Sequence, residues 1–268
     1  MAINDVSLTA GMRANLLALQ DTVNLLNRTQ SRLSTGKKVN TAIDNPVSFF
    51  ASQALTSRAS IIDSLKDAMG QAVQTITAAD KGIKAITSMI EQAKGIAQSA
   101  QSAVPQSAEM TSLQAQYNTL RTQLTELAED SGYKGKNLLS DDDLVVKFEG
   151  TTLTVEGFDA SAAGLGITEA TWSTGGSIDA DVDLLDAALV TLRQESSKMS
   201  GNLSIITVRQ EFSTNMINTL TEGSDKLTLA DTNEEGANML MLQTRQSLST
   251  TALSLSAQAA QSVLRLFQ

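Results

Sequence analysis

The stretch from residue 61 to residue 97, IIDSLKDAMGQAVQTITAADKGIKAITSMIEQAKGIA, decides the fold. Its apolar side chains recur three and four positions apart, which places them along one face of an α-helix. This seam consists of Ile62, Leu65, Met69, Ala72, Ile76, Ala79, Ile83, Ile86, Ile90, Ala93 and Ala97. The pattern predicts a helix from Asn45, its N-cap before Pro46, to about Ala100. At about 1.5 Å per residue this helix is roughly 80 Å long, longer than an ordinary domain is wide.

The same spacing recurs on both sides of this segment. It predicts a first helix over residues 6–34, ended by Gly36, and a returning helix after a bend at Pro105. Apolar periodicity then resumes between Leu185 and Leu227 and continues into a last helix. The seam of that last helix comprises Leu248, Ala252, Leu255, Ala259, Ser262 and Leu266.

The middle of the chain has a different pattern. LVVKFEG and TTLTVEG alternate apolar and polar residues on either side of Gly150, which predicts a β-hairpin. Gly, Ala, Ser and Thr dominate residues 157–177, which we expect to be irregular. The fold class is therefore mainly all-α, with long antiparallel helical rods and coiled-coil ends from both halves of the chain around a small β region.

This reading predicts three regions, two of them discontinuous in sequence. Residues 1–43 and 231–268 form a terminal helical domain, and residues 44–140 and 180–230 form a helical rod domain. Residues 141–179 form a small region of hairpin and loop at the outer surface.

The composition excludes most catalytic chemistry. The chain has no Cys and no His, so it has no thiolate nucleophile, Cys/His zinc site or His general base. Asp141, Asp142 and Asp143 lack the alternating ligands and the glycine of an EF-hand loop, which favours a solvated loop over a cation site. We expect no enzyme activity, no cofactor and no metal.

Charge is unevenly distributed along the chain. The net charge is −9, and residues 121–186 carry fourteen acidic and four basic side chains. This balance disfavours nucleic acid and anionic membranes as partners and predicts that the acidic middle faces solvent. The first ten residues, MAINDVSLTA, do not resemble a signal peptide, and no apolar run is long enough to cross a membrane.

The two ends have more apolar surface than they can cover themselves. Each terminal helix has one apolar stripe, and pairing two stripes leaves exposed flanks, so we expect identical chains to supply the missing cover. We expect the charged pair Arg28 and Arg32 to bridge neighbouring subunits. The predicted subunit interface comprises Leu16, Leu19, Val23, Leu26, Arg28, Arg32, Leu33, Leu248, Leu255, Val263, Leu266 and Phe267.

Two stretches resemble one known family. Residues 32–46, RLSTGKKVNTAIDNP, resemble the signature that follows the first helix of bacterial flagellins, and Gln258–Phe267 resembles their C-terminal helix. The likeness covers about 200 residues at the two ends. The pattern is similar to short flagellins of α-proteobacteria that lack large outer domains.

The resemblance implies a structural subunit of the flagellar filament that serves swimming motility. It implies export in an unfolded state through the flagellar type III apparatus, and an extracellular filament as the destination. The implied partners are other copies of the chain, an export chaperone, and junction and cap proteins. It also implies that the terminal helices line the filament channel.

One departure from the family bears on innate immunity. Many flagellins are recognised by a Toll-like receptor through an Arg, a Leu and a Glu, and the matching positions here are Glu91, Gly95 and Gln116. We expect weak or no recognition, because a charge is reversed, an apolar anchor is lost and a carboxylate is neutralised.

Two alternatives stay open from the residues. A hook-filament junction protein has similar ends but does not grow long filaments. A soluble coiled-coil signalling or scaffold module would have ordered helical ends as a monomer. Five polar residues interrupt the apolar seams: Gln30, Ser196, Gln210, Ser213 and Ser262. They either fix the register between helices or allow the helices to slide between alternative packings. The other alternative is that they are simply tolerated at partly exposed positions.

Overall fold

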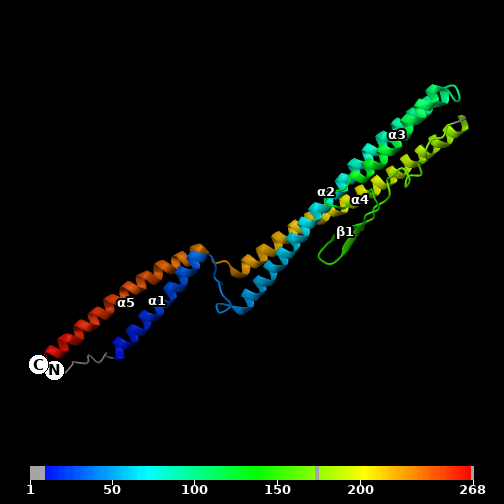
Figure 1. The fold of residues 1–268 in the computed structure, drawn as a ribbon. Helices are drawn as coiled ribbons and strands as arrows, with labels where there is room; N and C mark the ends of the chain where they lie inside the picture. The colour runs from blue at the N-terminus through cyan, green and yellow to red at the C-terminus, as the bar shows by residue number, and fades with distance from the viewer. Residues whose placement is uncertain (1–9, 173–174, 267–268) are drawn as a thin grey trace, which may run out of the picture. The chain divides into compact units, whose positions relative to one another are not determined.

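The computed structural model describes residues 10–172 and 175–266, with side chains up to residue 262 at the C-terminal end (Figure 1). The elements are five helices and two strands in these described ranges: α1 (Ala10–Thr35), α2 (Pro46–Ser102), α3 (Ala108–Asp130), β1 (Leu144–Lys147), β2 (Thr152–Val155), α4 (Gly175–Thr228) and α5 (Thr232–Leu266). The predicted mainly helical class with a small hairpin is confirmed. Residues 6–9 of the predicted first helix lie outside the described residues.

The chain forms two compact units. One unit combines residues up to 57 with those from 219 onward, and the other spans residues 58–218. The long helices α2 and α4 contribute to both units. The three-region division drawn from the sequence stays a prediction.

Local sequence explains where the longest helix begins. The side chain of Asn45 accepts a hydrogen bond from the backbone N–H of Ser48 at 3.1 Å, which satisfies a free donor in the first turn. Pro46 occupies the first helical position, where its missing N–H costs nothing. The predicted start and end of this helix are confirmed within two residues.

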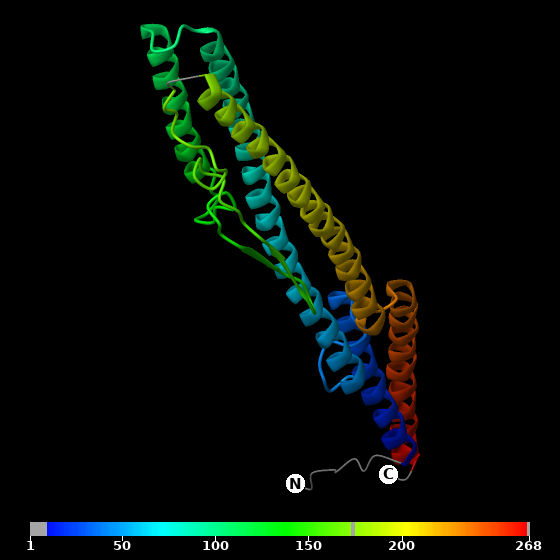
Figure 2. The same cartoon turned by 90° about the vertical axis from the view of Figure 1, so that its right-hand side faces the viewer.

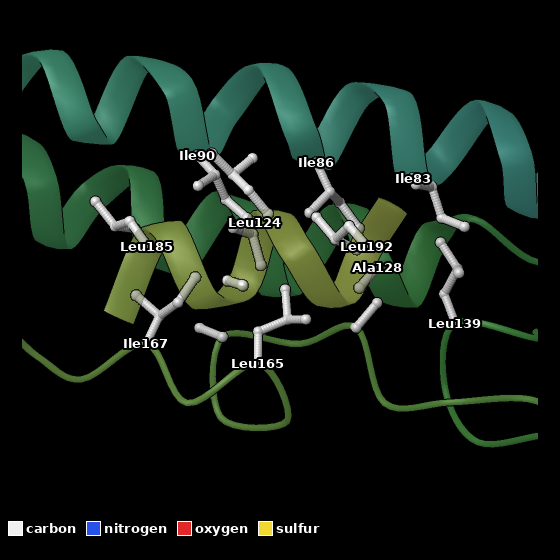
Figure 3. Close-up of a cluster of buried hydrophobic side chains, with 14 of the residues drawn as sticks. Ile83, Ile86, Ile90, Leu124, Ala128, Leu139, Leu165, Ile167, Leu185 and Leu192 are labelled. Carbon is white, nitrogen blue, oxygen red and sulfur yellow. The ribbon is translucent and has the colours of Figure 1, made fainter. Parts of the chain in front are cut away.

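The predicted seam of α2 forms the core of the unit that spans residues 58–218. In both views α2, α3 and α4 lie side by side there (Figures 1 and 2). Figure 3 shows side chains from the three helices directed toward one another, and all of those in this list are buried: Ile83, Ile86, Ile90, Leu124, Ala128, Leu185 and Leu192. Burial of this aliphatic layer is the main stabilising contribution in the unit.

The hairpin is confirmed in position. β1 and β2 pair antiparallel, with Leu144 opposite Val155 and Lys147 opposite Thr152. Val146 and Val155 are buried in the core of the unit, while alternate residues face outward. The two-strand sheet is therefore held by packing on the helices as well as by its own hydrogen bonds.

The segment after the hairpin, residues 157–172, is irregular as expected but is not a polar surface loop. We call it the strap. Six of its side chains are buried, namely Ala160, Ala162, Leu165, Ile167, Ala170 and Trp172. Leu165 and Ile167 point into the helical core (Figure 3). The strap therefore completes the core that the helices leave open.

Two expectations for this region are wrong. Residues 175–177 are not irregular, because α4 begins at Gly175. The acidic middle does not face solvent throughout, because Asp181 is only 6% exposed. Its carboxylate accepts hydrogen bonds from the indole N–H of Trp172 at 2.7 Å and the hydroxyl of Thr168 at 3.1 Å. Buried donors that hold a carboxylate make such a position tolerable.

The acidic triplet before β1 shapes its loop. The Asp142 carboxylate accepts from the Asn137 N–H at 3.0 Å, and the Asp143 carboxylate accepts from the Gly157 N–H at 3.1 Å. No group of acidic side chains within the described ranges is placed to hold a metal ion. The helices of those ranges also include no apolar segment of membrane-crossing length.

Candidate assembly surface

The terminal helices α1 and α5 pack against each other along most of their length (Figure 1). The predicted stripe of α1 faces α5, with Met12 buried and Leu16, Leu19, Val23 and Leu26 half-buried. Two hydroxyl residues on the same face, Thr22 and Thr29, are buried more deeply than these leucines. The face of α1 that contacts α5 is thus partly polar.

The face of α5 that contacts α1 is not the one that the apolar spacing indicates. The covered positions lie four and three residues apart and include many polar side chains: Glu235, Met239, Leu242, Gln246, Ser249, Leu253, Ser256 and Ala260. The apolar stripe that the sequence predicts is rotated by about one residue, or roughly 100°, from these positions. Most of its members therefore face away from α1.

We call the exposed apolar side of α5 the outer stripe; it comprises Met241, Leu248, Ala252, Leu255 and Ala259. Leu248 is 66% exposed and Leu255 is 61% exposed, although both sit in the middle of a regular helix. On α1, Leu17 is exposed to a similar degree. Met241, Leu248 and Leu255 expose large apolar side chains on this face, with the exposed Arg245 between the first two. Several such side chains on one face are typical of a protein-protein contact surface.

An ion pair joins the C-terminal end of α1 to the N-terminal end of α5. Nη1 of Arg32 lies 2.7 Å from Oε1 of Glu235, whose side chain is only 9% exposed. The structure thus gives Arg32 a partner within its own chain. Glu235 was not among the predicted site residues, and its position at the start of α5 is the only sequence signal that could have drawn attention to it.

The RLSTGKKVNTAIDNP stretch contains the loop from α1 to α2, which lies against the short connection from α4 to α5. Gly36 has a φ of +69°, the left-handed conformation that ends α1. The Lys38 N–H donates to the carbonyl of Thr228 at 2.7 Å, and the Ala230 N–H donates to the carbonyl of Gly36 at 3.0 Å. The two connecting segments therefore hold each other by backbone hydrogen bonds.

Asp44 closes the rest of this loop. Its Oδ2 accepts from the N–H of Thr41 at 2.9 Å, the N–H of Asn40 at 3.0 Å and the Thr41 hydroxyl at 3.1 Å. These donors, the backbone N–H of Thr41 first among them, lower the pKa of the Asp44 carboxyl below its ordinary value. The acidic residue of the stretch thus has a local structural role.

A hydroxyl cluster joins α2 and α4 next to this loop. The Ser52 and Ser224 hydroxyls are 2.8 Å apart, and the Thr56 hydroxyl is 3.1 Å from that of Ser224. Ser52 and Ser224 are buried. Small polar contacts therefore replace large aliphatic ones at this end of the long helices.

The remaining predicted site residues have mixed locations. Arg28 and Leu248 are exposed and Leu33 is half-buried. The side chains of Val263 and Leu266, and all of Phe267, lie outside the part of the chain that the structure describes. Among the polar interruptions of the seams, Gln30 is exposed beside the buried Thr29, whereas Ser213 is buried. The role of all these residues at a subunit interface stays a prediction.

The three positions that match the receptor motif are solvent-accessible. Glu91 and Gly95 are exposed on α2, and Gln116 is exposed on α3. The helix α2 continues without a break through Gly95. Burial of these three residues would therefore not be the reason for weak receptor binding.

Comparisons with known proteins give a consistent assignment. Residues 3–143 match the family model described as the bacterial flagellin N-terminal helical region. The chain is 26% identical to flagellin FljO of Caulobacter vibrioides and 24% identical to a flagellin of Brucella melitensis. These alignments cover all of both chains in the first case, and 99% of this chain and 98% of the relative in the second.

The structural comparison gives a partial match. A crystal structure of Bacillus cereus flagellin matches 56% of this chain and 88% of that chain, with a TM-score of 0.48 and 16% identity. The family model alone covers more than half of the chain, and relatives of similar length align from end to end. The chain belongs to the bacterial flagellin family, in a short form without large outer domains.

Proposed function

We propose that this chain polymerises with copies of itself into a flagellar filament, and that the outer stripe of α5 is a contact between subunits. The observation that carries the proposal is the exposure of Leu248 and Leu255 on a helix whose covered face is half polar. In a single chain this surface stays in water, whereas a second copy would remove it from water. The family to which the chain belongs is a family of structural proteins, which agrees with assembly rather than catalysis.

The test is seeded growth. Purified chain is mixed with short fragments of its own filaments, and elongation is followed by light scattering and electron microscopy. Leu248→Asp and Leu255→Asp each place a charge in the proposed contact and are expected to stop elongation. Gln243→Asp is the matched control, because Gln243 is also exposed on α5 but lies outside the outer stripe. Elongation of both leucine variants at the wild-type rate would contradict the proposal.

The proposed destination is the cell exterior, reached by export in an unfolded state with a chaperone, junction and cap proteins as partners. Resemblance to flagellins supports this part of the proposal. Deletion of the export apparatus in the source bacterium is expected to leave the chain inside the cell. Its appearance in the culture medium of such a deletion strain would overturn the export proposal.

We also propose weak recognition by the animal receptor that senses many flagellins. Glu91 and Gln116 present an acidic and a neutral side chain where the receptor-binding motif has a basic and an acidic one. The combined variant Glu91→Arg, Gly95→Leu, Gln116→Glu is expected to raise signalling in a receptor reporter cell line above that of the unmodified chain. Full potency of the unmodified chain in the same cells would exclude the proposal.

A further inference from the structure

The strap is attached to α3 in an unusual way. Its first residues pair with the backbone before β1, where the Ala160 N–H donates to the carbonyl of Leu139 at 2.9 Å, but from Ala162 to Trp172 its backbone is joined to four side chains of α3. The four side chains recur four, three and four residues apart, so they lie in one row on the helix surface; they belong to Gln114, Asn118, Arg121 and Thr125. This row provides the donors and acceptors that a neighbouring strand would otherwise supply.

The individual bonds follow the strap along this row. Asn118 both donates to the carbonyl of Ala170 at 3.2 Å and accepts from its N–H at 2.9 Å. Nε of Arg121 donates to the carbonyl of Ile167 at 3.0 Å. At the two ends, the Trp172 N–H donates to Gln114 at 3.2 Å and the Ala162 N–H donates to Thr125 at 3.3 Å.

Trp172 anchors the C-terminal end of the strap. Its indole N–H donates to the buried Asp181 carboxylate, and its ring lies 5.2 Å from that of Tyr117 between centroids. Asp181 also binds Thr168 of the strap, so one carboxylate on α4 holds two strap side chains. Hydrogen bonds to a charged acceptor are stronger than those between neutral groups.

These attachments differ in kind from those that hold the helices. Helical hydrogen bonds join residues four apart, whereas the strap bonds to α3 join residues 37 to 58 apart. The strap therefore gains its contacts only when distant parts of the chain are already in place. The backbone hydrogen bonds within the strap form one local turn, in which the N–H groups of Leu165, Gly166 and Ile167 donate to the carbonyls of Ser161, Ala163 and Ala162.

We propose that the strap is a latch: it opens and closes as one unit while α2, α3 and α4 stay formed, and the Trp172–Asp181 contact controls its opening. Irregular segments open with a smaller free energy than the core helices on which they pack. Opening would expose the aliphatic layer that Leu165 and Ile167 cover. The proposal concerns a single chain and does not depend on filament formation.

Hydrogen exchange of the full-length chain under native conditions tests the latch. We expect amides of residues 162–172 to exchange at least about tenfold faster than those of residues 185–199 in α4. Asp181→Asn removes the charge from the acceptor and is expected to speed strap exchange by a further factor of about ten. It should leave residues 185–199 unchanged.

Asp186→Asn is the matched control, because Asp186 is an exposed carboxylate on the same helix that pairs with Lys94 at 2.6 Å. It is expected to change neither rate. Trp172 is the single tryptophan of the chain, so its fluorescence reports latch opening independently. Its emission should shift to longer wavelength in denaturant before the α4 amides lose protection.

Two results would overturn the latch. One is equal exchange of the strap and α4 in the unmodified chain, and the other is equal acceleration of both by Asp181→Asn. Should Asp181→Asn fail to fold, Asn118→Ala gives the same comparison, because it removes two strap hydrogen bonds without touching the buried carboxylate.

Discussion

Arg32 and Glu235 lie 203 residues apart in the sequence and form an ion pair of 2.7 Å between the first and the last helix. The pair sits beside the backbone hydrogen bonds that join the two connecting segments. It fixes one point of the register in which α1 and α5 meet, and apolar side chains such as Met12 and Leu242 pack between the helices farther along.

Arg32→Ala should therefore weaken the terminal helices. The substitution leaves the carboxylate of Glu235 buried from water and without its ion-pair partner. This is expected to lower the stability of the packed terminal helices by about 1–3 kcal/mol. Thermal dissociation of assembled filaments measures the effect as a lower midpoint temperature. Lys226→Ala is the control, since its pair with Glu222 is largely exposed and should contribute almost nothing. Equal effects of the two substitutions would contradict a special role for Arg32.

Two glycines of α2 should respond in opposite directions to alanine. A Cβ at Gly82 would lie 2.6 Å from Cδ1 of Leu139 and would also clash with the side chain of Ser131. Gly82→Ala is expected to destabilise the chain by about 1–3 kcal/mol through overpacking. Nothing lies within 4 Å of a Cβ at Gly95, so Gly95→Ala should stabilise by about 0.5–1 kcal/mol. Denaturant unfolding measures both, and a stabilising Gly82→Ala would contradict the packing described here.

Asp44 should make the connecting loop sensitive to acid. Its folded-state pKa is lowered by the hydrogen bonds from Thr41 and Asn40, so its stabilising contribution is present above the unfolded pKa of about 3.9. That contribution is lost as the pH falls through the folded pKa. The unmodified chain should thus exceed Asp44→Asn in thermal midpoint at pH 6, and the difference should shrink at about pH 3. If the two thermal midpoints differ by the same amount at both pH values, the lowered pKa of Asp44 is not the source of the difference.

The hydroxyl of Tyr117 should be dispensable. It is buried and has no hydrogen-bond partner among the described residues, and burial raises its pKa to about 12. Tyr117→Phe removes an unsatisfied polar group, so unfolding in denaturant should show unchanged or slightly increased stability. Tyr133→Phe is the control, because that hydroxyl donates to Gln71 at 3.3 Å on the surface and should also change little. A loss of more than about 1 kcal/mol in Tyr117→Phe alone would reveal a partner for the hydroxyl.

The long helices could be predicted because their information is local. The seam from Ile62 to Ala97 repeats every three or four residues, and Asn45 and Pro46 mark where it starts. The hairpin was equally readable from alternation around Gly150. Each of these signals lies within the element that it specifies.

The strap could not be predicted as a core element. Its Gly, Ala, Ser and Thr residues have no period, and its partners on α3 are side chains such as Asn118 that lie dozens of residues away. The burial of Asp181 has the same cause, since its donors come from the strap. Residues that are ordered by distant side chains leave no local pattern.

The sequence also located the apolar stripe of α5 but not its orientation. Periodicity shows that Leu248 and Leu255 share a face, whereas the face packed on α1 mixes Leu242 and Leu253 with Gln246 and Ser249. A rule that places the most apolar face inward fails when the single chain is not the final state. The contact residues of such a helix need a structure to be assigned.

The partly polar lining between α1 and α5 has a consequence for how assembly begins. When two free chains meet, each must first order its helices α1 and α5, which are weakly held together in a single chain. The entropy cost of this ordering offsets most of the free energy gained by the contact between the chains. An existing filament end offers ordered neighbours, so an arriving chain can order its terminal helices and cover the outer stripe in one step. Growth should therefore show a threshold concentration and a lag that added seeds abolish.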